Sequence, residues 1–281
     1  MKGIILAGGS GSRLYPITKV YNKQLVALYD KPMIYYPLNT LLSIGITEIL
    51  VISSRDMLPL YEQLFGSGKQ LGINIIYAVQ DAPRGIAESF IIGENFIGRD
   101  NVCLILGDNI FYGACKCIKE VMDSHKATLF SKWVKNPQHY GVVCFEDGKP
   151  AKIVEKPSYF VSNFAVPGIY FYDSSVVAIA KSLSPSKRNE LEITDINNVL
   201  FSQDRLDLVH FEESVTWLDC GNPRSLLEAS NFIATNEHRN GKKIACIEET
   251  AYNMGYINKE QLYALARQMP KCEFSDYLLS I

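Results

Sequence analysis

Short apolar runs alternate with amphipathic stretches along the first half of the chain. Four of these runs are typical of buried strands: residues 2–7, 48–53, 73–79 and 102–106. Between them, residues 32–43, which end before Gly45, and residues 56–65 predict helices, although Pro37 is expected to weaken or kink the first one. This alternation predicts a parallel sheet that is covered by helices.

The second half of the chain is richer in strands and ends in helices. Strands are predicted at 127–134, 141–145, 151–155, 166–173, 206–211 and 214–218, and helices at 175–182, 192–201, 222–237 and 259–268. No repeat or obvious linker interrupts the pattern. We therefore expect an α/β fold with a Rossmann-like mixed sheet flanked by helices over residues 1–240, and a small helical appendage over residues 241–281.

Composition and charge exclude several classes of protein. The 281 residues carry a formal net charge of −2 with scattered Lys and Arg, so we expect no nucleic-acid-binding surface. No apolar run is long enough for a transmembrane helix, and Met1 leads directly into a strand-like run rather than a signal peptide. The seven cysteines are odd in number and scattered, which favours reduced thiols in a cytoplasmic protein that does not bind membranes.

The first apolar run leads into a glycine-rich segment, G-G-S-G-S-R at positions 8–13. Peptide N–H groups in such a turn form an anion site, and the guanidinium of Arg13 matches phosphate oxygens. Leu14 stands where the dinucleotide fingerprint needs its third glycine, and no P-loop Gly-Lys-Ser/Thr follows. Lys23 adds a second cation shortly afterwards. The segment predicts a phosphate cradle, with an ordinary glycine-rich turn as the alternative.

Two aspartates follow apolar strands at distant points of the chain. Asp108 comes after residues 102–106, and Asp219 comes after residues 214–218. The carboxyl ends of strands are where α/β sheets hold their sites, and Mg²⁺ takes one or two carboxylates together with phosphate oxygens. Each aspartate alone is more often a turn residue. Together with the cradle, they predict a metal site.

Further polar residues are candidates for binding a base and a sugar phosphate. The amide of Gln80 can both donate to and accept from the edge of thymine or uracil, and Gly85 would let the base approach closely. Glu155 can accept hydrogen bonds from sugar hydroxyls, and Lys156 can neutralise a phosphate. The alternatives are a surface glutamine and a surface ion pair.

Several longer motifs resemble the sugar nucleotidyltransferases, in particular those that use dTTP and glucose-1-phosphate. They include L-A-G-G-S-G-S-R-L-Y-P (6–16), Y-D-K-P-M-I (29–34), L-G-D-N-I-F-Y-G (106–113), Y-G-V-V (140–143), E-K-P (155–157), E-L-E-I-T-D-I-N (190–197) and W-L-D (217–219). The resemblance implies Mg²⁺-dependent nucleotidyl transfer that gives dTDP-glucose and pyrophosphate. It also implies a homotetramer that is inhibited by dTDP-rhamnose or a related dTDP-sugar.

The resemblance assigns roles to individual residues of this chain. It implies a nucleotide side over about 1–125 and a sugar-phosphate side over about 126–220. The implied catalytic residues are Arg13, Lys23, Asp108 and Lys156, and the implied metal ligands are Asp108 and Asp219. The implied nucleotide-binding residues are Leu6, Gly8, Gly9, Gly11, Ser12, Arg13, Lys23, Gln80, Gly85 and Asp108. The implied substrate-binding residues are Asn109, Tyr140, Gly141, Glu155, Lys156, Tyr170 and Arg188.

The chain departs from the family pattern at Asn22, Ala27, Arg84 and Cys220, and none of these positions carries a catalytic group. A glycosyltransferase of similar fold is an alternative, but an Asp-x-Asp motif would be expected where Asp108 is followed by Asn109. A nucleotide-sensing subunit without catalysis is a second alternative. Such a subunit would be expected to lose Arg13, Lys23 or the aspartates, and all of them are present here. The apolar residues after Gly241 are expected to pack either on the chain's own core or at a subunit interface that frames a second nucleotide-sugar site.

Overall fold

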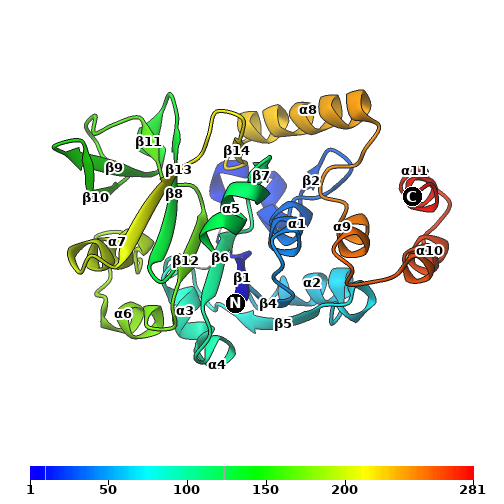
Figure 1. Cartoon of the computed structure of the whole chain (residues 1–281), viewed down its shortest axis with the longest axis horizontal. Coiled ribbons are helices and arrows are strands. Elements are labelled where there is room, and N and C mark those ends of the chain that lie inside the picture. Colours follow the sequence, from blue (N-terminus) through cyan, green and yellow to red (C-terminus); the bar gives the residue numbers. More distant parts are fainter. Residues whose placement is uncertain (10, 123) are drawn as a thin grey trace.

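The computed structural model of the chain describes residues 1–9, 11–122 and 124–281, so Ser10 of the glycine-rich segment and Asp123 lie outside the described residues. Within these ranges, the main sheet has ten strands in the order β10-β9-β11-β8-β12-β6-β1-β4-β5, with β13 paired to β8. Figure 1 shows β9 and β10 at one end of the molecule, and α10 and α11 at the other. The predicted mixed α/β sheet is confirmed.

The centre of the main sheet is parallel. β1 (Lys2–Leu6) lies between β4 (Glu48–Ser53) and β6 (Val102–Leu106), and β5 (Asn74–Val79) continues the sheet beyond β4. These strands are the four apolar runs of the first half of the sequence. Because parallel strands end at the same edge of a sheet, β1 and β6 bring the glycine-rich segment and Asp108 to one place.

The other strands make the sheet mixed. β12 pairs antiparallel with β6 and with β8, whereas β13 runs parallel to β8. β9 and β10 form an antiparallel pair, and β11 joins them to β8. The bounds are β8 (Ala127–Trp133), β9 (Gly141–Glu146), β10 (Lys149–Glu155), β11 (Phe164–Ala165), β12 (Ile169–Tyr172) and β13 (Leu206–His210).

Side chains of the central strands alternate between two cores, as the pleat of a strand requires. Ile5 and Ile105 belong to the first core, and Ile4 and Leu104 belong to the second. The first core is covered by α1 (Tyr35–Ser43), α2 (Leu58–Phe65) and α5 (Cys115–Val121). The second is covered by α3 (Glu88–Ile92), α4 (Glu94–Ile97), α6 (Val176–Ser182) and α7 (Ile193–Ser202).

Two short ribbons stand apart from the main sheet. β2 (Ala27–Leu28) pairs with β3 (Lys31–Pro32), so Pro32 belongs to a strand and not to the first helix, which begins at Tyr35. Pro37 lies in the first turn of α1, where N–H groups have no intrahelical acceptor, and it therefore removes no helical hydrogen bond. The second ribbon pairs β7 (Asn109–Tyr112) with β14 (Thr216–Asp219).

The C-terminal helices pack against the rest of the chain. They are α8 (Pro223–Asn240), α9 (Ile247–Asn253), α10 (Lys259–Gln268) and α11 (Glu273–Leu279). Thr250 Oγ1 donates to Asn39 Oδ1 at 2.6 Å, and the Tyr256 hydroxyl donates to the Leu42 carbonyl at 2.9 Å, which ties this segment to α1.

Much of the apolar surface in the segment after Gly241 is buried within the chain itself. Ile247 and Ile257 are buried in the first core, and Tyr252 and Tyr256 pack against it. These side chains therefore pack on the chain's own core, which is the first of the two predicted alternatives. The subunit interface stays a prediction. No helix of the described residues is long and apolar enough to cross a membrane.

Candidate active site

A cavity of about 140 Å³ opens where the carboxyl ends of the central strands meet the sugar-phosphate side. Residues from distant segments line it, among them these predicted site residues: Arg13, Asp108, Asn109, Tyr140, Gly141, Glu155, Lys156, Tyr170 and Asp219. The glycine-rich loop and Gln80 lie beside this cavity rather than in its lining. The structure thus gathers the predicted metal residues and all of the predicted sugar-phosphate residues except Arg188 around one space.

The β7–β14 ribbon brings the two aspartates together. Asp219 is paired with Asn109, and the Cys220 amide donates to the Asp108 carbonyl at 3.1 Å. Burial would raise the pKa of Asp108, but the ion pair with Lys23 and hydrogen bonds from Lys23 and Asn109 hold that pKa below its usual range. Burial, and then the charge of Asp108, raise the pKa of Asp219 to about 6.

This carboxylate pair has the chemistry of a site for a hard divalent cation. Two partly buried carboxyl groups that repel each other gain from a bound dication, and Mg²⁺ commonly takes few protein ligands while phosphate oxygens and water complete its shell. Within the parts of the chain that the structure describes, no group of three or more His, Cys, Asp and Glu has the arrangement of a metal site. Asp108 and Asp219 would therefore hold such an ion together with the substrate's oxygens.

Asn109 lines the cavity, but its amide is engaged with the protein. Its Oδ1 accepts hydrogen bonds from Trp217 Nε1 at 2.7 Å and from the Gly168 amide at 3.0 Å. Its Nδ2 donates to Asp108 Oδ1 at 2.9 Å. The geometry makes Asn109 a residue that positions Asp108, and its contact with the substrate stays a prediction.

The glycine-rich loop has backbone angles and close contacts that require glycine. Gly9 has φ +96° and Gly11 has φ +57°, both in the left-handed region. A Cβ on Gly8 would lie 2.7 Å from Gln80 Oε1, and a Cβ on Gly11 would lie 2.7 Å from Thr18 Cγ2. The loop runs from Leu6, the last residue of β1, to Ser12, the first residue of the 3₁₀ turn that carries Arg13.

Two residues after this loop fix its position. Asn22, a departure from the family pattern, is buried and its Nδ2 donates to the Ala7 carbonyl at 2.7 Å and to Ser53 Oγ at 3.1 Å. Gln24 Nε2 donates to the Gly8 carbonyl at 3.2 Å. Both contacts hold the start of the loop against the end of the sheet, next to Lys23. The substitution at position 22 therefore has a structural role of its own.

The surroundings of Gln80 differ from the expectation. Its Nε2 donates to Glu88 Oε2 at 2.8 Å and to the Gly85 carbonyl at 3.3 Å, so both amide hydrogens have protein acceptors. Gly85 has φ +104°, and a Cβ there would lie 2.3 Å from the Leu191 carbonyl oxygen. The packing of Leu191 thus requires glycine at position 85, and the approach of a base to this residue stays a prediction.

The sugar-phosphate side is built on β9, β10 and the start of α7. Gly141 is paired with Glu155, whose Oε2 accepts a hydrogen bond from Thr194 Oγ1 at 2.6 Å. Lys156 has φ +41° and its amide donates to the Tyr140 carbonyl at 2.9 Å, while its half-exposed side chain points an ammonium to within 3.6 Å of Glu155 Oε1.

Of two further predicted sugar-phosphate residues, Tyr170 lies in the cavity and Arg188 lies outside its lining. Tyr170, on β12, is buried and lines the cavity. Arg188 is not among the lining residues, and its guanidinium reaches Glu192 at 2.6 Å and Glu155 at 3.4 Å. Arg188 thus contacts the site through Glu155.

Several lining residues escaped the sequence analysis. They are Ile86, Leu106, His139, Val166, Gly168, Ile193 and Trp217. Trp217 had a signal, since it stands two positions before Asp219 in the W-L-D motif, and its ring lies 4.9 Å from that of Tyr140. The others did not stand out, as Leu106 illustrates, because an apolar residue at the end of a strand looks the same whether it faces a core or a cavity.

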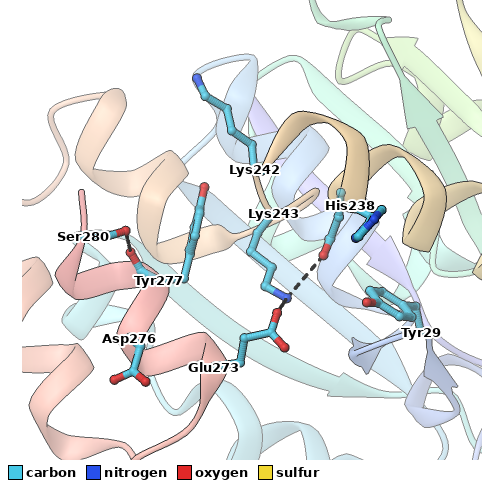
Figure 2. A pocket seen from close by; sticks show the side chains of 10 residues that line it. Tyr29, His238, Lys242, Lys243, Glu273, Asp276, Tyr277 and Ser280 are labelled. Carbon is cyan, nitrogen blue, oxygen red and sulfur yellow. Dashed lines mark hydrogen bonds and ion pairs between the residues drawn. The ribbon is translucent and has the colours of Figure 1, made fainter.

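A second cavity, of about 540 Å³, lies between the end of α8 and α11, and Figure 2 shows its lining. Lys243 is at its centre, paired with Glu273 at 2.9 Å and with Glu237 at 3.3 Å. Lys242 supplies a further positive charge here, but Glu237, Glu273 and Asp276 also line the cavity. This balance of charge does not favour a diphosphate.

A glycine-rich loop and paired aspartates at the carboxyl edge of a mixed sheet are typical of transferases that handle nucleotides. The sequence model of nucleotidyl transferases matches residues 2–236, and the chain belongs to that family. The predicted family is confirmed.

The chain is similar over its whole length to proteins of one activity. It is 48% identical over 285 residues to the glucose-1-phosphate thymidylyltransferase of Neisseria meningitidis serogroup A, with 100% of this chain and 99% of that protein covered. It is 48% identical over 284 residues to the enzyme of the same name from Mycobacterium tuberculosis strain H37Rv, with the same coverage.

Solved structures agree with the fold. A putative glucose-1-phosphate thymidylyltransferase from Bacillus anthracis, in complex with a sucrose, superposes with a TM-score of 0.77 at 41% identity, covering 83% of this chain and 94% of that one. A UDP-glucose pyrophosphorylase complexed with UDP-glucose has a TM-score of 0.74 at 24% identity, covering 84% of this chain and 98% of that one, and supports the fold alone.

Proposed function

We propose that this chain transfers a thymidylyl group from dTTP to glucose-1-phosphate and releases dTDP-glucose and pyrophosphate. The observation that carries the proposal is the single cavity that Arg13, Lys156, Asp108 and Asp219 share beside the glycine-rich loop. A site for joining two polyanions needs cations and a metal-binding carboxylate pair at one point, and this cavity has both. The full-length similarity to thymidylyltransferases supports the choice of substrates.

The reaction needs no protein base and no covalent enzyme intermediate. The phosphate oxygen of glucose-1-phosphate is already an anion, and it forms a bond to the α-phosphorus of dTTP while the bond to pyrophosphate breaks. The task of the protein is to bring two anions together and to hold them in line. Lys156 would neutralise the sugar phosphate, while Arg13 and Lys23 would hold the triphosphate.

We infer that Asp108 and Asp219 bind Mg²⁺. When bound, the ion would neutralise charge on the phosphate oxygens. The protein supplies the rest from its own side chains: Lys23 pairs with Asp108, and Asn109 orients the same carboxylate. This arrangement keeps the Asp108 carboxylate in place before any ligand arrives.

A direct assay tests the proposal. The purified chain is mixed with dTTP, glucose-1-phosphate and Mg²⁺, and release of pyrophosphate is followed, with excess chelator as the control. We expect turnover that the chelator abolishes. A panel of four nucleotides and several hexose-1-phosphates then ranks the substrates. No pyrophosphate from any pair would overturn the proposed function, and full activity in excess chelator would overturn the metal.

We further propose a cytoplasmic homotetramer that acts first in a dTDP-deoxysugar pathway and is inhibited by dTDP-rhamnose or a related dTDP-sugar. The free cysteines support a reducing compartment. An end product that binds between subunits can bias two arrangements of the assembly. Light scattering measures the oligomer, and kinetics measure whether excess dTTP and glucose-1-phosphate relieve inhibition. A monomer with purely competitive inhibition would contradict both statements.

A further inference from the structure

The amide of Gln80 reaches from the end of β5 to the glycine-rich loop. Its backbone N–H donates to the Ser53 carbonyl at 2.8 Å, which fixes the residue beside β4. Its Oε1 lies over Gly8, 2.7 Å from the place of a Cβ. Among the described residues, no hydrogen bond is donated to this oxygen. Gln80 thus presents to the loop that would hold the nucleotide an acceptor that receives no hydrogen bond from the described residues.

The other end of the amide is fixed by two acceptors. Glu88 Oε2 and the Gly85 carbonyl oxygen both receive hydrogens from Nε2. Turning the amide over would place Oε1 against these two oxygens and lose both hydrogen bonds. A carboxylate and a carbonyl can only accept, so the orientation of the amide is determined by its partners.

The carboxylate that fixes Gln80 is itself held by Arg84. Arg84 Nε donates to Glu88 Oε1 at 2.6 Å, which leaves Oε2 for Gln80. The Glu88 side chain is 9% exposed, whereas that of Arg84 is 52% exposed. Position 84 is one of the places where the sequence departs from the family pattern, and the guanidinium there compensates a nearly buried carboxylate.

We propose that Glu88, held by Arg84, locks the Gln80 amide so that the chain accepts pyrimidines with an N3–H and rejects cytosine. Thymine and uracil carry a hydrogen on N3, which Gln80 Oε1 can accept. Cytosine has a lone pair at N3, which faces the same oxygen without a hydrogen between them. Glu88 and Arg84 act through Gln80 and are positioning residues. This inference rests on the proposed function, because it places the base of dTTP beside Gln80.

The test is the conservative substitution Glu88→Gln. A glutamine at position 88 can donate as well as accept, so the Gln80 amide gains a second orientation. We expect the ratio of kcat/KM for dTTP to that for dCTP to fall by about tenfold or more, since a misoriented hydrogen bond at a nearly buried site is costly. The ratio of dTTP to UTP should not change, because both bases carry N3–H.

Two further variants separate a positioning role from a merely structural one. Gln80→Glu places two carboxylates together and should lose nucleotide binding, whereas Gln80→Glu with Glu88→Gln restores a donor–acceptor pair and should recover dTTP binding and its preference over dCTP. Glu94→Gln is the control, because Glu94 lies on α4 in a surface pair with Lys181 at 2.5 Å.

Nucleotide binding by calorimetry, without sugar phosphate, distinguishes the two proposals. If the wild-type chain releases no pyrophosphate, the proposed function fails, yet binding of dTTP against dCTP still tests Glu88. If the wild-type chain turns over dTTP and folded Glu88→Gln keeps the wild-type dTTP-to-dCTP ratio, the role of Glu88 is overturned. Should Glu88→Gln not fold, failure of the double variant to recover the preference would overturn it equally.

Discussion

The pKa values of the two aspartates of the cavity are shifted in opposite directions, although the two residues are neighbours in space. The pKa of Asp108 is held down by Lys23, whereas burial and then the charge of Asp108 raise the pKa of Asp219 to about 6. Lys23 therefore neutralises one carboxylate of the pair and leaves the other without a full counter-charge. A bound dication would satisfy both.

Asp108→Asn and Asp219→Asn should each nearly abolish turnover. An asparagine keeps the shape of the side chain but removes its charge, and the loss of metal stabilisation should lower kcat on the order of a thousandfold. Pyrophosphate release measures the rate, and circular dichroism checks the fold. Asp147→Asn is the control, since Asp147 is exposed in the β9–β10 turn at φ +51°, which asparagine tolerates. Near-normal rates in both aspartate variants would contradict the metal site.

Gly85→Ala should lower the free energy of unfolding by about 3 kcal/mol, because strain at a positive φ adds to a backbone clash. Its φ is +104°, and a Cβ would lie 2.3 Å from the Leu191 carbonyl. Gly241→Ala is the control: φ is +63° there with no atom within 4 Å of a Cβ, so it should cost about 1 kcal/mol. Urea unfolding compares the two variants, and equal losses would contradict the clash.

At this scale the sequence predicted where the charged groups lie better than what each polar group does. Arg13 and Asp108 follow β1 and β6, parallel strands whose carboxyl ends meet at one edge, so their convergence could be predicted. Asp219 reaches the same place through the separate β7–β14 ribbon. The hydrogen bond from Gln80 to Glu88 could not be predicted, because Glu88 belongs to α3, a five-residue helix without a clear periodic signal. The contact of Asn109 with Trp217 could not be predicted either, because the two residues are distant in sequence.

At the scale of elements, the β7–β14 ribbon determines the geometry of the site. β7 begins three residues after β6 ends, and the sequence analysis assigned no strand to residues 109–112, so the ribbon was not predicted. The central strands and the long helices were predicted, because each is a long apolar or periodic segment. α10 spans Lys259–Gln268, as its periodicity and the following proline indicate.

Trp217→Phe should weaken this ribbon. It removes the Nε1 hydrogen bond to Asn109 Oδ1, which still accepts from the Gly168 amide, and should cost about 1–2 kcal/mol of stability. Because Asn109 also orients Asp108, kcat should fall as well. The chain offers a matched control in Trp133→Phe, since Trp133 is 58% exposed on β8. Equal effects of the two substitutions on urea unfolding would contradict the role of the hydrogen bond.

At the scale of the whole molecule, a network of charges around the nearly buried Lys243 side chain connects the C-terminal helices to the catalytic fold. Lys243 pairs with Asp30 at 2.9 Å, with Glu273 of α11 at 2.9 Å and with Glu237 of α8 at 3.3 Å. Lys31 also contacts Asp30 and Glu237. The sequence could not predict this network, because its members come from four separate segments and none stands in a charge pattern.

Lys243→Met should loosen the attachment of α11 to the fold. The substitution keeps an apolar side chain of similar length but leaves Asp30 and Glu237 with Lys31 alone, and breaking such a nearly buried ion pair should cost about 3 kcal/mol. Hydrogen exchange over α10 and α11 should rise together with the loss in urea stability. Lys242→Met is the control, because Lys242 lines the same cavity and makes no ion pair among the described residues.

The same network predicts how acid affects the chain. Burial would raise the pKa of Asp30, but Lys31 and Lys243 outweigh it and lower that pKa. A carboxyl group with a lowered pKa in the folded state stabilises the fold above its ordinary pKa, and this contribution is lost as the pH falls through the lowered value. Urea stability of the wild-type chain should therefore decrease below about pH 4, and this part of the decrease should be smaller in Lys243→Met. If both proteins lose stability in parallel as the pH falls, Asp30 does not hold the C-terminal helices through Lys243.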